Sequence, residues 1–202
     1  INYQNFQNGA RYGYMHQYVR NTLQLNQGPG LLEKDSIGIP VFSEVGYFAG
    51  IAQTDWSWAP LAIDADNDGY RDIIVSNGLP KDLTDMNFIA YRNQAIANVA
   101  PEEILKQLPS VKISNYIFKN NGDITFSNKT KDWGWDIPNF SAGMAYADFD
   151  RDGDIDVIVN NTNMEASLME NTLSDKKLAE ANYLRVQLQG NGLNRNGVGA
   201  VI

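Results

Sequence analysis

Two nine-residue stretches decide the fold: Asp64-Ala-Asp-Asn-Asp-Gly-Tyr-Arg-Asp72 and Asp148-Phe-Asp-Arg-Asp-Gly-Asp-Ile-Asp156. Each has aspartate at positions 1, 3, 5 and 9 and glycine at position 6. A chain that curls around a cation turns alternate side chains inward, and glycine at position 6 permits the positive φ of a sharp turn. Oxygen ligands in this number suit Ca²⁺ better than octahedral Mg²⁺. The sequence therefore predicts two Ca²⁺ sites, one in each Asp loop.

The expected ligands are the side chains at positions 1, 3, 5 and 9 and the backbone carbonyl at position 7. They are Asp64, Asp66, Asp68, Tyr70 and Asp72 in the first loop, and Asp148, Asp150, Asp152, Asp154 and Asp156 in the second. Position 12 is valine in both copies, where an EF-hand needs an acidic residue. Two plain acidic turns are the alternative, but four carboxylates held within ~5 Å would repel one another without a cation.

The Asp loops belong to an internal repeat. A shift of 84 residues aligns Phe42–Asn77 with Phe126–Asn161 without a gap, and 12 of the 36 positions are identical. The repeat extends backward at a different offset, because Asn21–Gly28 resembles Asn115–Gly122. Repetition on this scale indicates repeated supersecondary units.

Each copy contains the pattern of four short strands. Tyr116–Lys119 and Ile124–Ser127 flank a turn that contains Asn-Gly, which predicts a hairpin. Short apolar runs such as Leu61–Ile63 and Ile73–Val75 enter and leave the Asp loop, as in strands buried on both faces. Four strands per repeated unit are typical of a β-propeller blade. We therefore predict a mainly β fold, a partial β-propeller with four-stranded antiparallel blade units at residues 21–78 and 115–172.

A helical insertion is expected at residues 79–114, between the two copies. Asp82–Val99 has a helix-forming composition, and Pro101–Leu108 begins with proline and two acids, as helix N-termini often do. Residues 1–20 are expected to be helical or irregular, with a helix at Tyr12–Arg20. The alternating pattern of Tyr183–Leu188 predicts a return to β-structure near the C-terminus.

The pattern Asp-x-Asp-x-Asp-Gly-x-x-Asp followed by an apolar strand resembles the FG-GAP/VCBS repeats of integrin-type β-propellers. Residues 182–202 resemble the opening of an ASPIC/UnbV module. The resemblance implies an extracytoplasmic protein of Gram-negative bacteria, particularly Bacteroidota, either secreted or associated with the outer membrane at the cell surface. It also implies that the calcium ions brace strands without chemistry, and that the two units form an arc whose remaining blades lie elsewhere in a longer chain.

Composition excludes several other classes of function. The formal net charge is −8, with 24 acidic and 16 basic residues, which disfavours nucleic acid and anionic membranes as partners. There is no cysteine, and His16 is the only histidine, so thiol chemistry and multi-histidine metal sites are not expected. No apolar run approaches the ~20 residues of a transmembrane helix, and no signal peptide opens the sequence.

The expected function is the binding or scaffolding of glycans or of envelope protein partners, without catalytic residues. The alternative is the propeller portion of an extracellular polysaccharide-degrading enzyme, which would need a pair of carboxylates outside the Asp loops. Trp58 and Trp133 align with alanines of the other copy, whereas Trp56 and Trp135 align with large apolar residues. We therefore expect the tryptophans mainly to pack within the blades, and Trp58 and Trp133 to be the better candidates for a contact specific to one copy, such as the stacking of a carbohydrate.

Overall fold

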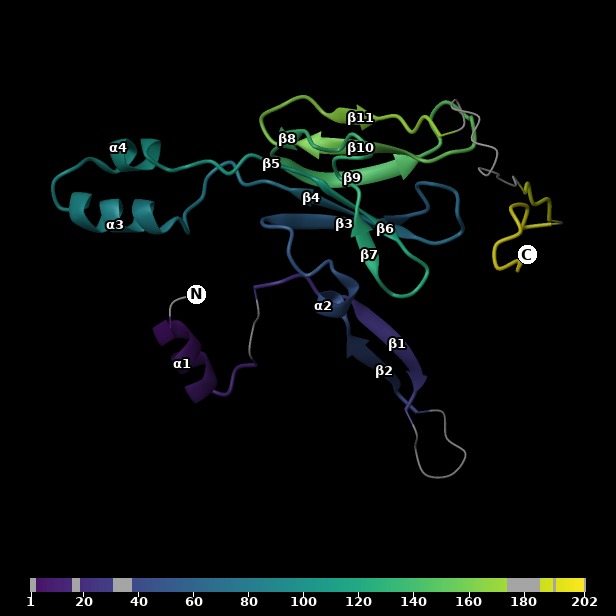
Figure 1. The fold of residues 1–202 in the computed structure, drawn as a ribbon, viewed down its shortest axis with the longest axis horizontal. Coiled ribbons are helices and arrows are strands. Elements are labelled where there is room, and N and C mark those ends of the chain that lie inside the picture. Colours follow the sequence, from purple (N-terminus) through teal and green to yellow (C-terminus); the bar gives the residue numbers. More distant parts are fainter. Residues whose placement is uncertain (1–2, 16–18, 31–37, 174–185, 191, 202) are drawn as a thin grey trace.

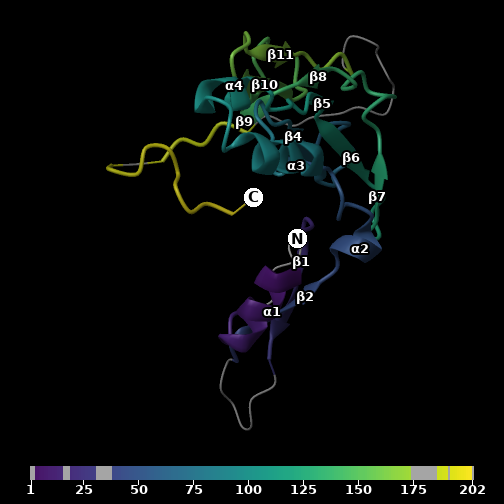
Figure 2. The same cartoon turned by 90° about the vertical axis from the view of Figure 1, so that its left-hand side faces the viewer.

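The computed structural model describes residues 3–15, 19–30, 38–173, 186–190 and 192–201. Among the described residues, strands account for 31% and helices for 15%, so the prediction of a mainly β fold is confirmed. The strands form several antiparallel sheets, and within the described residues none of these sheets closes into a ring. Two of the sheets stack on each other and carry the Asp loops (Figures 1 and 2).

The first of these sheets is a four-stranded antiparallel meander. It contains β3 (Ser57–Ile63), β4 (Asp72–Asn77), β6 (Tyr116–Asn120) and β7 (Phe126–Asn128), in that order. The first Asp loop joins β3 to β4, while the β6–β7 hairpin comes from the second copy of the sequence repeat. The sheet therefore combines strands from both copies, and the unit in space is offset from the unit in sequence.

The second sheet repeats the first three strands. It contains β9 (Ser141–Ala147), β10 (Asp156–Asn161) and β11 (Ser167–Met169), in the order β11-β10-β9. Its register matches that of the first sheet. Ile158 lies between Ala145 and Leu168, just as Ile74 lies between Leu61 and Ile117.

The main core lies between the two sheets. Its buried members are Ile63, Ile74, Ile117, Trp135, Val157 and Val159. Full burial of an aliphatic side chain of this size stabilises the fold by roughly 1.5–3 kcal/mol, so this cluster fixes one sheet on the other. A second cluster covers the far side of the first sheet, where α2 (Gly46–Ala49) packs; it contains Ala49, Ile51, Val75 and Phe118.

The predicted helical insertion is present as α3 (Met86–Ala95) and α4 (Pro101–Lys106), which project from one end of the stacked sheets (Figure 1). The first helix begins later than Asp82 because the Asp85 side chain caps it, accepting a hydrogen bond from the N–H of Phe88 at 2.7 Å. Asp82 instead accepts the Thr84 N–H in a local turn. Phe88, Ala95 and Ile104 form a small core of their own.

The remaining elements lie outside the stacked sheets. β1 (Gln24–Pro29) pairs with β2 (Pro40–Glu44), and β5 (Ile113–Ser114) pairs with β8 (Pro138–Asn139). In the part of the chain that the structure describes, no helix is long and apolar enough to span a bilayer.

Two sequence-based predictions near the ends of the chain need correction. The helix expected at Tyr12–Arg20 is wrong at the described positions, because α1 covers Tyr3–Arg11 and a turn with Gly13 at φ 76° follows it. His16 lies outside the described residues. A strand is expected at Tyr183–Leu188. Residues 183–185 lie outside the described residues, and Val186–Leu188 is not in a strand.

Candidate metal centres

Each Asp loop gathers three carboxylates at one end of a sheet. In the first loop they belong to Asp64, Asp66 and Asp72, and one oxygen from each lies within 4.8 Å of the others. The second loop does the same with Asp148, Asp150 and Asp152. Three carboxylate oxygens at this spacing could hold a metal ion. The predicted convergence is present in part, because the group in the first loop lacks Asp68 and the group in the second lacks Asp156.

The aspartate at position 9 ties each loop to the neighbouring strand. Asp72 accepts the backbone N–H of Ala65 at 3.0 Å with Oδ2 and that of Asn120 at 2.8 Å with Oδ1. Its side chain is fully buried. Asp156 repeats this arrangement with Phe149 at 2.9 Å and Asn171 at 2.8 Å. The same two oxygens thus accept equivalent donors in both loops, which makes Asn120 and Asn171 equivalent positions.

The loop backbone follows the expected turn. Gly69 has φ 90° and Gly153 has φ 100°, so position 6 uses the left-handed conformation that glycine adopts without strain. The residue at position 7 donates its N–H to the carboxylate at position 5, from Tyr70 to Asp68 at 2.9 Å and from Asp154 to Asp152 at 3.1 Å.

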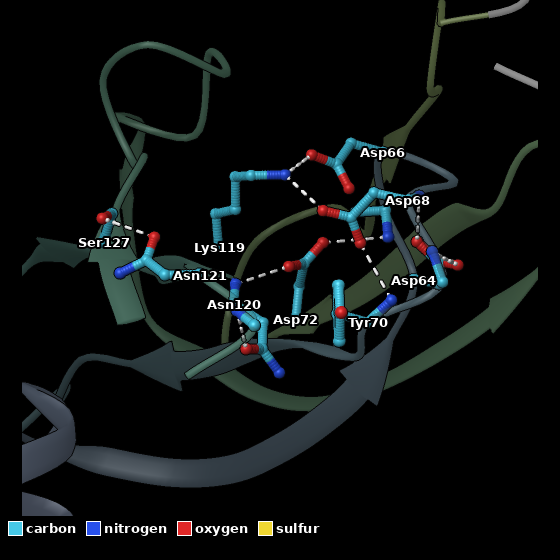
Figure 3. Close-up of polar contacts among 12 residues, drawn as sticks. Asp64, Asp66, Asp68, Tyr70, Asp72, Lys119, Asn120, Asn121 and Ser127 are labelled. Atoms are coloured by element: carbon cyan, nitrogen blue, oxygen red, sulfur yellow. Dashed lines mark hydrogen bonds and ion pairs between the residues drawn. The ribbon is translucent and has the colours of Figure 1, made fainter. Parts of the chain in front are cut away.

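A lysine from the neighbouring strand enters the first loop. Lys119, on β6, donates from Nζ to Asp66 Oδ2 and, at 2.6 Å, to Asp68 Oδ2 (Figure 3). All three side chains are partly buried. This contact turns Asp68 toward the lysine, and Asp68 is not part of the group formed by Asp64, Asp66 and Asp72.

Electrostatics differ between the two loops. Burial raises the pKa of Asp72 to about 6, against the opposing effect of its two backbone hydrogen bonds. Desolvation would also raise the pKa of Asp68, but the hydrogen bonds from Lys119 and Tyr70 outweigh it and lower that pKa. In the second loop, desolvation and the charge of Asp152 raise the pKa of Asp150 above its ordinary value. The first loop therefore has a compensating charge beside its carboxylates.

The donor sets fit a hard cation. Asp66 Oδ1 and Asp148 Oδ1 are buried and accept no hydrogen bond. A buried carboxylate oxygen without a donor is costly, and a bound cation would satisfy it. Of the remaining predicted ligands, Tyr70 has an exposed side chain, Asp154 is fully buried, and Asp156 is held by backbone N–H groups.

Sequence reasoning did not predict Lys119 or the two asparagines. The signal that could have found them is the similarity between Tyr116–Asn120 and Ser167–Asn171, since both segments end in asparagine next to a charged residue.

No protein-family model matches the chain, and no curated protein matches it either. The resemblance to FG-GAP/VCBS repeats therefore depends on the Asp loops and on the strands that flank them.

The two tryptophans that are the better candidates for a ligand contact each line a pocket. Trp58 is exposed and lines an open apolar pocket of about 450 Å³ on the first sheet, where its Nε1 donates to the Gly78 carbonyl at 2.6 Å. Trp133 lines a pocket of about 620 Å³ that contains both apolar and acidic side chains. The acidic side chains belong to Asp66, Asp132 and Glu170.

Proposed function

We propose that this protein is a calcium-stabilised segment of a β-propeller, exposed outside the cytoplasm on a bacterial surface or secreted. The observation that carries the proposal is the pair of loops that occupy equivalent sheet positions with equivalent hydrogen bonds at Asp72 and Asp156. Each loop brings three carboxylates within 4.8 Å, and their repulsion favours a divalent cation. Millimolar calcium outside the cytoplasm suits a loop of modest affinity.

The stacking of the sheets supports an arc of a larger ring. Ile74 and Ile117 are 0% and 2% exposed in the core between the sheets. The equivalent residues of the second sheet, Ile158 and Leu168, are 39% and 61% exposed. Because equivalent faces carry equivalent apolar rows, we infer that a further blade from the rest of a longer chain packs on Ile158 and Leu168. An ASPIC/UnbV module at 182–202 would follow this arc.

Removal of calcium tests the proposal. Binding to the native state alone adds about 2.7 kcal/mol at a calcium concentration 100-fold above Kd. For a chain of this length, that corresponds to a fall in the unfolding temperature of roughly 5–10 °C when excess EDTA is added. Scanning calorimetry with calcium, with EDTA and after restored calcium measures the shift. An unchanged melting curve in EDTA would contradict the proposal.

Matched variants show whether the shift arises at the Asp loops. Asp64→Asn combined with Asp148→Asn removes one predicted ligand from each loop, and we expect the calcium-dependent shift to be lost. Asp136→Asn changes an exposed carboxylate that accepts from Ser114 at 2.8 Å outside the loops, so it should keep the shift. Equal loss in both variants would point to a nonspecific effect of charge.

For the binding activity, we propose a glycan in the Trp133 pocket. An indole ring can stack on a sugar ring, and carboxylates such as Asp132 and Glu170 can accept hydrogen bonds from hydroxyl groups. Trp133→Ala should abolish retention on a glycan array that retains the unaltered protein, while Trp58→Ala should not. A pull-down from envelope extracts that captures a protein, with no glycan bound, would favour the scaffolding role.

The same pocket keeps the polysaccharide-degrading alternative open, because Asp132 and Glu170 are carboxylates outside the Asp loops. A hydrolase would use such a pair on opposite sides of the glycosidic bond. Incubation with a retained polysaccharide separates the two functions. Binding alone leaves the chain length unchanged, whereas hydrolysis shortens it and depends on Glu170.

A further inference from the structure

The hairpin formed by β1 and β2 is built like the hairpin formed by β6 and β7. Three consecutive residue pairs of the two hairpins correspond under the sequence repeat. The chain also leaves both hairpins in the same way. In the first, the Val45 N–H donates to the Leu23 carbonyl at 2.8 Å, and in the second the Lys129 N–H donates to the Ile117 carbonyl at 2.9 Å. Leu23 therefore takes the place that Ile117 has in the second hairpin.

The two hairpins differ in what lies along their first strand. β6 pairs with β4, where Ile117 faces Ile74 and the Asn120 N–H donates to the Asp72 carboxylate at 2.8 Å. Among the described residues, β1 pairs with β2 alone, and the hairpin projects from the stacked sheets (Figure 1). Asn26 is the equivalent of Asn120, so its N–H points away from β2, toward an edge that no described strand occupies.

An apolar pocket beside this edge repeats the main core without its central strand. In the main core, Ile74 clusters with four residues from β6, β10 and the segment before β8. They are Ile117, Trp135, Val157 and Val159. The repeat places four apolar residues at the equivalent positions one unit earlier: Leu23, Ile51, Ile73 and Val75. All four line the open pocket of about 450 Å³ beside Trp58. A side chain in the position of Ile74 is what the described residues do not supply there.

We propose that the open edge of β1 and this pocket form a docking site for an antiparallel strand of a further repeat unit, namely the strand that leaves an Asp loop. The aspartate at position 9 of that loop accepts the Asn26 N–H, and the aliphatic residue two positions later pairs with Leu23 and fills the pocket. The inference deepens the proposed function, since it rests on the segment being an arc of repeated units. A second copy of this chain offers Ile158 to the pocket but no free strand, because β10 is paired with β9 and β11.

Binding of a synthetic peptide to the 202-residue chain tests the proposal. The peptide has the sequence of residues 71–78, Arg-Asp-Ile-Ile-Val-Ser-Asn-Gly, and carries a fluorescent label whose anisotropy reports binding. Strand addition takes its affinity from backbone hydrogen bonds and its specificity from pockets for alternate side chains. Ile74→Ser in the peptide should therefore weaken binding at least tenfold, while Ile73→Ser should change it less than threefold. Absence of binding at millimolar peptide would overturn the proposal.

Two variants of the protein at Asn26 separate the strand edge from the pocket. Asn26→Pro removes the N–H that should meet the peptide, and proline is tolerated where the N–H faces away from the paired strand. We expect it to weaken peptide binding at least tenfold. Asn26→Ala keeps that N–H and, like the proline variant, loses the side-chain contact with the Gly28 N–H at 2.8 Å, so it should bind as the unaltered protein does. Circular dichroism checks that both variants fold. Equal binding by the two variants would overturn the proposed edge.

Calcium dependence separates this proposal from calcium binding itself. The peptide has no complete Asp loop, so its affinity should agree within threefold in calcium and in EDTA. Peptide binding in both buffers, without any calcium-dependent shift in unfolding temperature, would reject the calcium proposal and keep the docking site. A calcium-dependent shift without peptide binding would reject the docking site alone.

Discussion

At the scale of single residues, the aspartates of one loop have different tasks. The aspartate at position 9 is a buried acceptor for backbone N–H groups, whereas Asp150 at position 3 is exposed and its side chain accepts the Asp152 N–H at 3.2 Å. Acceptance of backbone N–H groups by the aspartate at position 9 does not require a bound metal. The spacing of the aspartates alone could not reveal this difference, because the Asn171 donor lies outside the loop, just after β11.

This difference predicts separate effects of two isosteric changes. Asp156→Asn places an amide N–H₂ against the N–H donors of Phe149 or Asn171, and we expect it to lower the free energy of unfolding by about 2–4 kcal/mol. Asp150→Asn should change that free energy by less than about 0.5 kcal/mol in EDTA and should reduce stability only when calcium is present. Urea denaturation in both buffers measures the two effects. Equal stability of the two variants in EDTA would refute the assigned roles.

Residue patterns also show how much of the candidate site the sequence could predict. Alternate aspartates and a central glycine predict the convergence of carboxylates, because the loop makes its own local contacts. Lys119 could not be predicted in this way, since it lies in a hairpin far along the chain and reaches the loop only through the pairing of β4 with β6.

At the scale of elements, the strands and the two inserted helices follow from local patterns, whereas the grouping of strands into sheets does not. The connection from β4 to β6 covers residues 78–115 and contains α3 and α4. The equivalent connection from β10 to β11 covers only residues 162–166. The helices therefore extend a link between neighbouring strands of one sheet. Loop closure becomes only slightly less favourable with length, so such an extension is compatible with the same sheet.

The turn of the β6–β7 hairpin differs in length from the one that the sequence predicts. The Asn-Gly turn predicted in the β6–β7 hairpin is wider than expected, because Asn121 donates to the Thr125 carbonyl at 3.0 Å and Ile124 takes φ 74°. Strand β7 consequently begins at Phe126, two residues after the predicted start. A turn signal gives the position of a hairpin more reliably than its length.

At the scale of the whole molecule, the two sheets stack front to back. Leu61, Ile74 and Ile117 of the first sheet pack against Val157 and Val159 of the second. Val157 and Val159 lie on the face of the second sheet opposite to Ile158. The counterparts of Val157 and Val159 in the first sheet are Ile73 and Val75, which line the open apolar pocket beside Trp58. The helix α2 and the second core cluster cover part of that face, so the first sheet offers an apolar pocket and the second sheet offers the exposed residues Ile158 and Leu168.

The open end of the second sheet predicts self-association of this segment when it is isolated. Ile158 and Leu168 can pack on the pocket beside Ile73 of another copy, because that contact repeats the packing between the two sheets. Leu168→Lys should keep stability within about 0.5 kcal/mol, since the residue is exposed, and should shift the protein toward monomer. Ile117→Lys, at the equivalent buried position, should unfold the protein, because an uncompensated charge would enter the core. Sedimentation velocity across a wide range of concentrations measures the association, and a Leu168→Lys variant that associates as strongly as the unaltered protein would show that the open face is not the contact surface.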